Sequence, residues 1–228
     1  MPTQFHVSEE SLGHHYSVVT ADDQGGKHQF YVENAPGASK KPDLTFYDGA
    51  DNTGSLIGLS KFPRITNNCE VRLVDEQSNE DWVPVTKRGF MSMKYTFEIP
   101  AGCKQGALTW KKTRSMGSGS SPYGNMKLVD EKSHNVLAVF SSDSFSLVTG
   151  RLDMCQDQGG SFDRWALITG MAVREKQRRH TIGTVRSKEN VYTMGAAGGG
   201  MGMGAMGGMG GGGGVLVWPL TSKYFYKL

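Results

Sequence analysis

The sequence has little cysteine and no clustered histidine. Its three cysteines, Cys69, Cys103 and Cys155, lie far apart, and none belongs to a C-x-x-C pair. An odd number at such spacing argues against both a disulfide framework and a zinc site. The histidines are scattered, and the adjacent pair His14 and His15 would point to opposite faces of a strand. We therefore expect no metal, no cofactor, and buried free thiols.

Long apolar runs are also missing. The longest, residues 165–173, falls well short of the roughly 20 residues that a membrane-spanning helix needs. The first 15 residues have neither the basic start nor the apolar centre of a signal peptide. We expect no transmembrane segment and an intracellular, cytoplasmic protein that is compatible with peripheral association at a membrane.

No catalytic motif stands out. The loop Gly117–Ser121 lacks the strand–turn–helix context of a nucleophile elbow. Gly202, Gly204 and Gly207 match G-x-G-x-x-G, but within a Gly/Ala/Met run that offers no flanking strand or helix. No specific nucleic-acid motif is visible either. We predict a protein that is not an enzyme and has no catalytic residue.

Positive charge is concentrated in one segment. The net charge is +3, yet residues 174–188 contain six basic residues and one acidic residue, so the remainder is close to neutral. The basic residues are Arg174, Lys176, Arg178, Arg179, Arg186 and Lys188. Such a distribution indicates a local anion-binding surface or a soluble helix end, and not a uniformly basic coat.

Short strands fill most of the chain. Between residues 14 and 151, apolar segments alternate with turns rich in Gly, Asn and Asp. The clearest period of two is in residues 91–99, where Met93, Tyr95 and Phe97 share one face and Lys94 and Thr96 the other. The pattern predicts an antiparallel meander of about 11–12 strands that closes into a barrel.

One helix, at about residues 161–179, interrupts this pattern. Ser161 is a good N-cap, and Asp163 suits the first turn. The following run is also short enough to be a strand, but its length and its cap favour a helix. It has no polar face, so the helix should be buried, with Trp165, Ile168 and Ala172 in the core.

We therefore expect the helix to thread the barrel and leave its charged end in water. Its Gly170 would be explained by a group packed closely against the backbone. The predicted organisation is an N-terminal extension (1–12), the barrel with its helix (13–180), a disordered basic and Gly/Met-rich linker (181–214), and an apolar, aromatic segment (215–228).

The segments "SFDRWALITGMAVREKQRR" and "NVLAVFSSDSFSLVTGRLDM" resemble the tubby C-terminal-like superfamily, and most of all its fungal domains of unknown function. The resemblance covers roughly residues 10–180 and implies a closed β-barrel around a central hydrophobic helix. Relatives in this superfamily include phosphoinositide-binding tubby proteins, phospholipid scramblases and LURP-one-like proteins. It leaves the function of this chain open, because one fold supports many functions.

Two basic clusters are candidate contacts for an anionic lipid. Lys111, Lys112 and Arg114 lie beside Trp110 at a predicted strand end, and Arg178 and Arg179 lie at the helix end. Each cluster is also explained by a solvated strand or helix end. We expect a non-enzymatic binding module for an anionic lipid, such as a phosphoinositide, or for a partner protein. The alternative is a lipid-handling protein of the scramblase kind.

Overall fold

The computed structural model describes residues 3–10, 14–21, 27–35, 41–74, 81–89, 93–100, 106–113, 125–142 and 148–197, with only the backbone for 182–197. These ranges contain twelve strands and one helix. The strands are β1 (Gln4–Glu9), β2 (Tyr16–Ala21), β3 (Lys27–Asn34), β4 (Leu44–Asp48), β5 (Ser55–Lys61), β6 (Cys69–Leu73), β7 (Val83–Arg88), β8 (Lys94–Glu98), β9 (Ala107–Lys112), β10 (Met126–Asp130), β11 (Val136–Ser142) and β12 (Gly150–Met154), and the helix is α1 (Gly160–Ala197).

The strands form a closed antiparallel barrel, as predicted. Each strand pairs with the next along the chain, and β1 pairs with β12 to close the sheet. Inward positions follow the period of two, as in β8, where Tyr95 and Phe97 are buried while Lys94 and Glu98 are exposed. Closure pairs the backbone groups that edge strands would otherwise expose.

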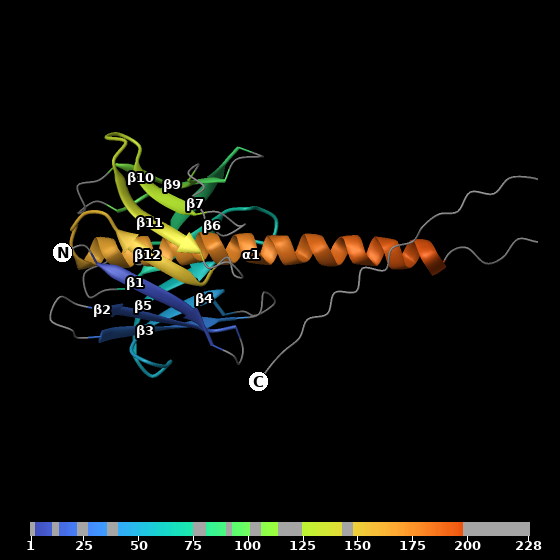
Figure 1. The fold of residues 1–228 in the computed structure, drawn as a ribbon, viewed down its shortest axis with the longest axis horizontal. Coiled ribbons are helices and arrows are strands. Elements are labelled where there is room, and N and C mark those ends of the chain that lie inside the picture. Colours follow the sequence, from blue (N-terminus) through green and yellow to red (C-terminus); the bar gives the residue numbers. More distant parts are fainter. Residues whose placement is uncertain are drawn as a thin grey trace, which may run out of the picture. The chain divides into compact units, whose positions relative to one another are not determined.

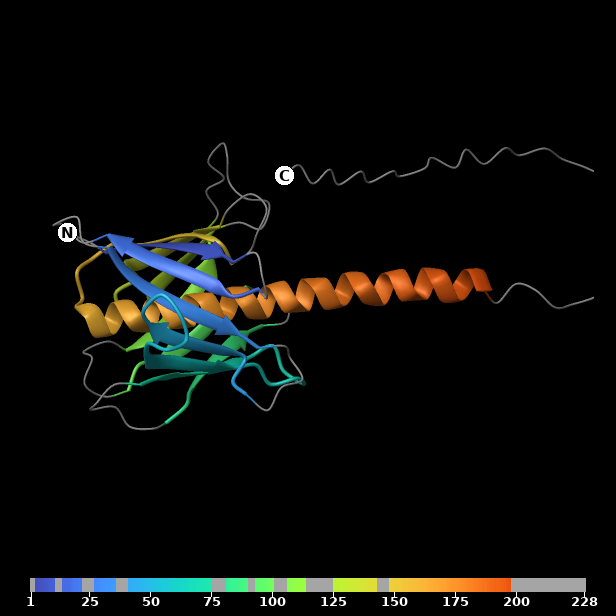
Figure 2. The ribbon, with the colours of Figure 1, turned by 90° about the horizontal axis from the view of Figure 1, so that it is seen from below.

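The helix fills the interior of this barrel. Figure 1 and Figure 2, seen from two perpendicular directions, show the first half of α1 running along the middle of the barrel. Leu167, Ile168 and Ala172 are fully buried, although they point in different directions around the helix, and Trp165 is 6 % exposed. A helix that is buried on all sides must have apolar residues on all sides, which explains its lack of a polar face.

Close packing around Gly170 confirms the reason expected for this glycine. A Cβ atom added there would lie 3.0 Å from Trp110 and 3.6 Å from Phe140. Beside it, the Trp110 indole N–H donates to the Thr169 hydroxyl at 2.9 Å, and that hydroxyl donates to the Trp165 carbonyl at 2.7 Å. The two polar groups in this apolar interior therefore satisfy each other.

The structure differs from the sequence-based expectations in three places. Residues 4–9, assigned to an N-terminal extension, form β1 and close the barrel. The helix continues to Ala197 instead of ending near residue 179, because the segment that follows contains no proline and only two glycines, Gly183 and Gly195. Met93 precedes β8 and is 46 % exposed, so it does not share the buried face of Tyr95 and Phe97.

The chain divides into two compact units, Met1–Ser187 and Lys188–Leu228. The barrel and the helical residues inside it belong to the first unit. In the second unit, residues 188–197 are helical. The Gly/Met-rich segment beyond residue 197 and the aromatic segment 215–228 lie outside the described residues.

Candidate anion-binding site

One end of the barrel holds a cluster of polar and charged side chains. The helical residues 175–180 lie there, and we call it the Arg179 end. Tyr16 begins β2, Asn34 ends β3, and Asp43 immediately precedes β4. Neighbouring antiparallel strands run in opposite directions, so the start of one and the end of the next meet at the same end of a barrel.

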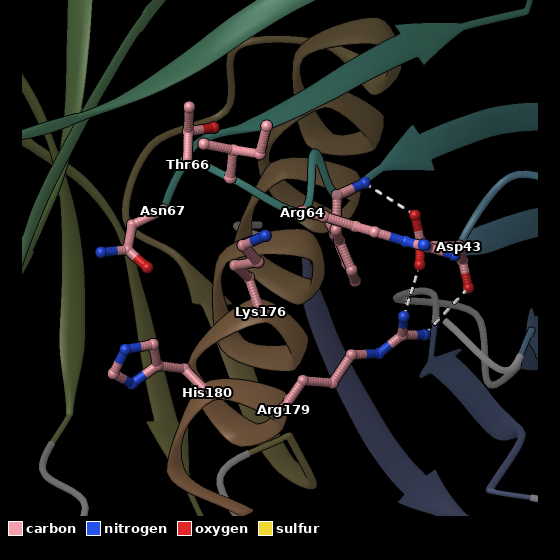
Figure 3. A pocket seen from close by; sticks show the side chains of 9 residues that line it. Asp43, Arg64, Thr66, Asn67, Lys176, Arg179 and His180 are labelled. Atoms are coloured by element: carbon pink, nitrogen blue, oxygen red, sulfur yellow. Dashed lines mark hydrogen bonds and ion pairs between the residues drawn. The ribbon is translucent and has the colours of Figure 1, made fainter. Parts of the chain in front are cut away.

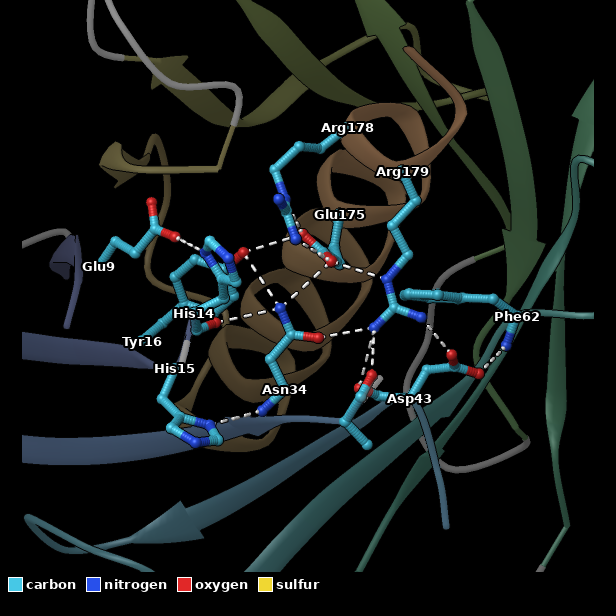
Figure 4. A network of polar contacts seen from close by, with 11 residues as sticks. Glu9, His14, His15, Tyr16, Asn34, Asp43, Phe62, Glu175, Arg178 and Arg179 are labelled. Carbon is cyan, nitrogen blue, oxygen red and sulfur yellow. Dashed lines mark hydrogen bonds and ion pairs between the residues drawn. The ribbon is translucent and has the colours of Figure 1, made fainter. Parts of the chain in front are cut away.

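The Glu175 carboxylate is the centre of this polar cluster. Its side chain is fully buried, yet it accepts five hydrogen bonds (Figure 4). Arg178 donates through Nε and Nη2 at 2.6 and 2.8 Å, and Arg179 donates through Nε at 2.7 Å. The Tyr16 hydroxyl donates at 2.8 Å and the Asn34 amide at 3.2 Å. A buried carboxylate is stable only with such complete pairing.

Asn34 ties the helix to two strands. Its backbone N–H donates to Nδ1 of His15 at 3.0 Å, and its side-chain amide donates to the carbonyl of His14 at 3.0 Å. Its side-chain oxygen accepts a hydrogen bond of 2.6 Å from Nη2 of Arg179. Donors and acceptors of the amide are therefore both satisfied, and its orientation is fixed.

Arg179 uses its whole guanidinium group. Besides its bond to Glu175, it pairs with the Asp43 carboxylate and donates to the Ala35 carbonyl at 2.8 Å. The other Asp43 oxygen accepts a 2.7 Å hydrogen bond from the Phe62 backbone N–H. This planar fork of donors is a property of arginine that lysine lacks.

Charge within this cluster is balanced. Two arginines face two carboxylates, Glu175 and Asp43, so Arg178 and Arg179 are neutralised inside the protein. Burial alone would raise the pKa of Glu175, but the hydrogen bonds and charges of the two arginines outweigh it and hold that pKa below its ordinary value. Burial, with the nearby Glu175 charge, raises the pKa of Tyr16, which keeps its hydroxyl proton available to donate.

Arg174 also departs from the expectation of a charged end in water. It is 1 % exposed, and its Nη2 donates to the Phe140 carbonyl at 3.4 Å. Its guanidinium also lies 5.4 Å from the centre of the Phe140 ring. Burial lowers the pKa of Arg174 to about 10, so the side chain is charged at neutral pH inside the barrel.

A cavity of about 260 Å³ lies beside this network. Figure 3 shows Lys176 and His180 on the helix, facing Thr66 and Asn67 on the connection between β5 and β6. The remaining lining residues are Asp43, Phe62, Arg64, Ile65 and Arg179. Cations therefore outnumber carboxylates in the wall, and Asp43, its one carboxylate, is already paired with Arg179.

Lys176 is the cation that this cavity leaves available. Its ammonium group donates to the Pro63 carbonyl at 2.8 Å, and the described residues offer no acceptor for its other two N–H groups. The Phe62 ring lies 5.7 Å from the nitrogen. Burial lowers the pKa of Lys176, which indicates a charge that an incoming anion would stabilise.

The structure separates the five predicted lipid contacts. Arg178 and Arg179 belong to the internal network, and Lys111 and Lys112 lie on β9, outside the cavity. Arg114 lies outside the described residues. Trp165, Ile168 and Ala172 are core residues, as predicted.

Sequence reasoning missed the residues that build the network and the cavity. Asn34 stands at a strand end, and Asp43, Thr66 and Asn67 stand in polar segments that look in sequence like ordinary connections. A signal was present in Glu175, the one acidic residue in the basic segment 174–188, but its partners are brought to it only by closure of the barrel.

The described ranges contain no group of three or more His, Cys, Asp or Glu side chains arranged for a metal ion. Within the same ranges, no helical segment combines the length and the apolarity needed to cross a membrane.

Comparison with known proteins finds no matching family model, no matching curated protein and no matching solved structure.

Proposed function

We propose that this protein is a non-enzymatic binding module whose ligand is the phosphate-bearing head group of an anionic membrane lipid. The observation that carries the proposal is the cavity beside α1, where Lys176 keeps two N–H donors that find no acceptor among the described residues. A phosphate group offers several acceptor oxygens and a negative charge, which such a site would stabilise.

The rim of the cavity supports a membrane as the source of that phosphate. Ile65, on the connection between β5 and β6, is 99 % exposed. At an anionic membrane, this side chain would enter the head-group layer while the neighbouring basic residues bind lipid phosphates. Arg64 and His180 line the same cavity and add basic groups to it.

We further propose that the chain belongs to the tubby C-terminal-like superfamily. The closed antiparallel barrel of twelve strands around a buried helix supports this assignment. The proposed ligand rests on the cavity and not on the family, because fold alone does not determine function.

Vesicle co-sedimentation tests the proposed function. Phosphatidylcholine vesicles are compared with vesicles that also contain a phosphoinositide, or phosphatidylserine at matched charge. We expect binding to the anionic vesicles, with a preference for the phosphoinositide. Lys176→Gln should weaken it about fivefold, which corresponds to the roughly 1 kcal/mol that one basic residue contributes at an anionic surface.

Two further variants sharpen the experiment. Ile65→Ser should also weaken vesicle binding, because it removes the apolar contact but no charge. Lys132→Gln, on the exposed turn between β10 and β11 at the opposite end of the barrel, removes one charge and should have no effect. Equal vesicle binding by Lys176→Gln and the unmodified protein would contradict the proposal, as would no binding by the unmodified protein.

A further inference from the structure

A row of aromatic rings lies on the outside of the barrel, across β2–β4. The strand register places Tyr31 opposite Tyr47, and both residues alternate along their strands with the buried Val32 and Phe46, so they point outward. The ring centres of Tyr31 and Tyr47 are 6.3 Å apart, and the ring of His15, which immediately precedes β2, is 5.7 Å from that of Tyr31. Three half-buried rings therefore stand side by side on the wall of the barrel.

Carboxylates surround this row. Glu33, on β3, accepts a hydrogen bond of 3.3 Å from the Tyr47 hydroxyl. Burial raises the pKa of Tyr31, and the nearby charges of Glu10, Glu33 and Asp51 raise it further, so the negative potential of these carboxylates reaches the rings. We call the three rings and the three carboxylates the acidic aromatic surface.

The charge of this surface is negative. Lys41, whose side chain is 71 % exposed, pairs with Glu33 at 3.4 Å. Within the described part of the chain, neither Glu10 nor Asp51 has an ion-pair partner, so one positive charge faces three negative ones. Such a surface repels an anionic bilayer and nucleic acids, and it attracts a cationic partner.

The arrangement of the rings indicates the form of that partner. Rings in a row do not enclose a common centre, as the aromatic cage around a single ammonium group does. Side chains on one face of an extended chain repeat about every 6.7 Å, which is close to the ring-centre distances of 5.7 and 6.3 Å. Because the barrel is closed, an extended peptide finds no strand edge to join, and its side chains must supply the recognition.

We propose that the acidic aromatic surface binds an extended segment of a partner protein in which arginines alternate with small residues. Each guanidinium group stacks on one ring and pairs with a neighbouring carboxylate, which are two contacts that arginine combines better than lysine does. Tyrosine and arginine are also enriched among the residues that dominate the binding energy of protein interfaces. The surface shares no residue with the cavity beside Lys176, so this inference goes beyond the proposed lipid function and does not depend on it.

Fluorescence anisotropy of the full chain at low salt, with a labelled hexapeptide of alternating arginine and serine, tests this inference. We expect saturable binding, and weaker binding of the isomeric peptide of equal charge in which the three arginines are consecutive. Tyr31→Thr combined with Tyr47→Thr should weaken binding about tenfold, because two cation–π contacts are lost. Tyr31→Phe keeps the ring and should keep the affinity. Glu10→Gln should weaken binding about two- to fivefold.

Matched controls separate this surface from others. Trp82 is another half-buried aromatic residue, but two cations, Lys61 and Arg72, lie against its ring. Trp82→Thr and Lys176→Gln should therefore bind the alternating peptide as the unmodified protein does. A urea melt confirms that the double threonine variant is folded.

Three results would overturn the inference: no binding of the alternating peptide by the unmodified protein, equal binding of the isomeric peptide, or full affinity in the folded double threonine variant. If that variant loses vesicle binding while the unmodified protein binds no peptide, the surface belongs to a membrane site and the inference is also wrong.

Discussion

At the scale of single residues, Glu175 has the most consequences. Its buried carboxylate joins the helix to β2 and β3, and it pairs with both Arg178 and Arg179. Arg178 and Arg179, which look in sequence like a basic helix end, therefore belong to an internal ion network. Lys176, one residue further along the helix, lies in the wall of the cavity and takes no part in this network.

Glu175→Gln should change both the stability of the protein and its dependence on pH. Near pH 6 the loss of the buried carboxylate should lower the free energy of unfolding by about 3–5 kcal/mol, since Arg178 loses its ion-pair partner and Arg179 keeps only Asp43. The pKa of Glu175 in the folded protein lies below its unfolded value of about 4.3. Its contribution is therefore fully present above pH 4.3 and is lost as the pH falls through the folded-state pKa.

Urea melts of both proteins between pH 6 and pH 3 measure this effect. The difference between the two unfolding free energies should shrink as the pH falls. Arg179→Lys serves as a companion variant, because lysine keeps the charge but cannot reach Glu175, Asp43 and Asn34 together. A difference that stays constant with pH would show that the carboxylate is not what stabilises this end of the barrel.

At the scale of elements, the buried part of the helix forms the core, and the inward side chains of the strands pack around it. Gly170 matters because Trp110 and Phe140 lie against its Cα. Gly170→Leu should destabilise the protein by about 1–3 kcal/mol or more, because a packed wall cannot accommodate the added atoms. Ile168→Ala should cost about 2–5 kcal/mol through lost burial and a residual cavity. Chemical denaturation of both variants provides the measurement.

The direction of the glycine effect is the decisive part of that experiment. On a solvent-exposed helix, replacement of a mid-helix glycine by leucine would stabilise the protein, since leucine has the higher helix propensity. A stabilised Gly170→Leu protein would therefore contradict a helix that is packed on all sides.

The sequence predicted the elements better than their contacts. Most strands and the buried helix were predictable from the sequence. The alternation of polar and apolar residues at 94–98 and the lack of a polar side in residues 165–173 both reflect burial directly. β1 was missed because its six residues carry only two apolar side chains, Phe5 and Val7, among polar neighbours. The polar network could not be foreseen, because Tyr16 and Asn34 reach Glu175 only once the barrel has closed.

At the scale of the whole molecule, closure depends on β1. This strand contributes Phe5 and Val7 to the interior and pairs with both β2 and β12. Phe5→Ala should lower the free energy of unfolding by about 3–5 kcal/mol. His6→Ala, on the exposed face of the same strand, should change it by no more than about 0.5 kcal/mol. Urea denaturation compares the two, and equal small effects would mean that residues 4–9 do not close the barrel in solution.

The position of the helix in the chain has a consequence for how the protein is made. All twelve strands precede α1 in sequence, so a ribosome releases the whole wall of the barrel before the residues that occupy its interior. Until residues 160–180 have emerged, the inward side chains of the sheet lack the helix they pack against. β1 cannot pair with β12 until that strand, the last in the sheet, has been synthesised. The nascent strands therefore remain exposed, with unpaired edges, for most of translation. Folding of this barrel is an event that follows synthesis of its last element.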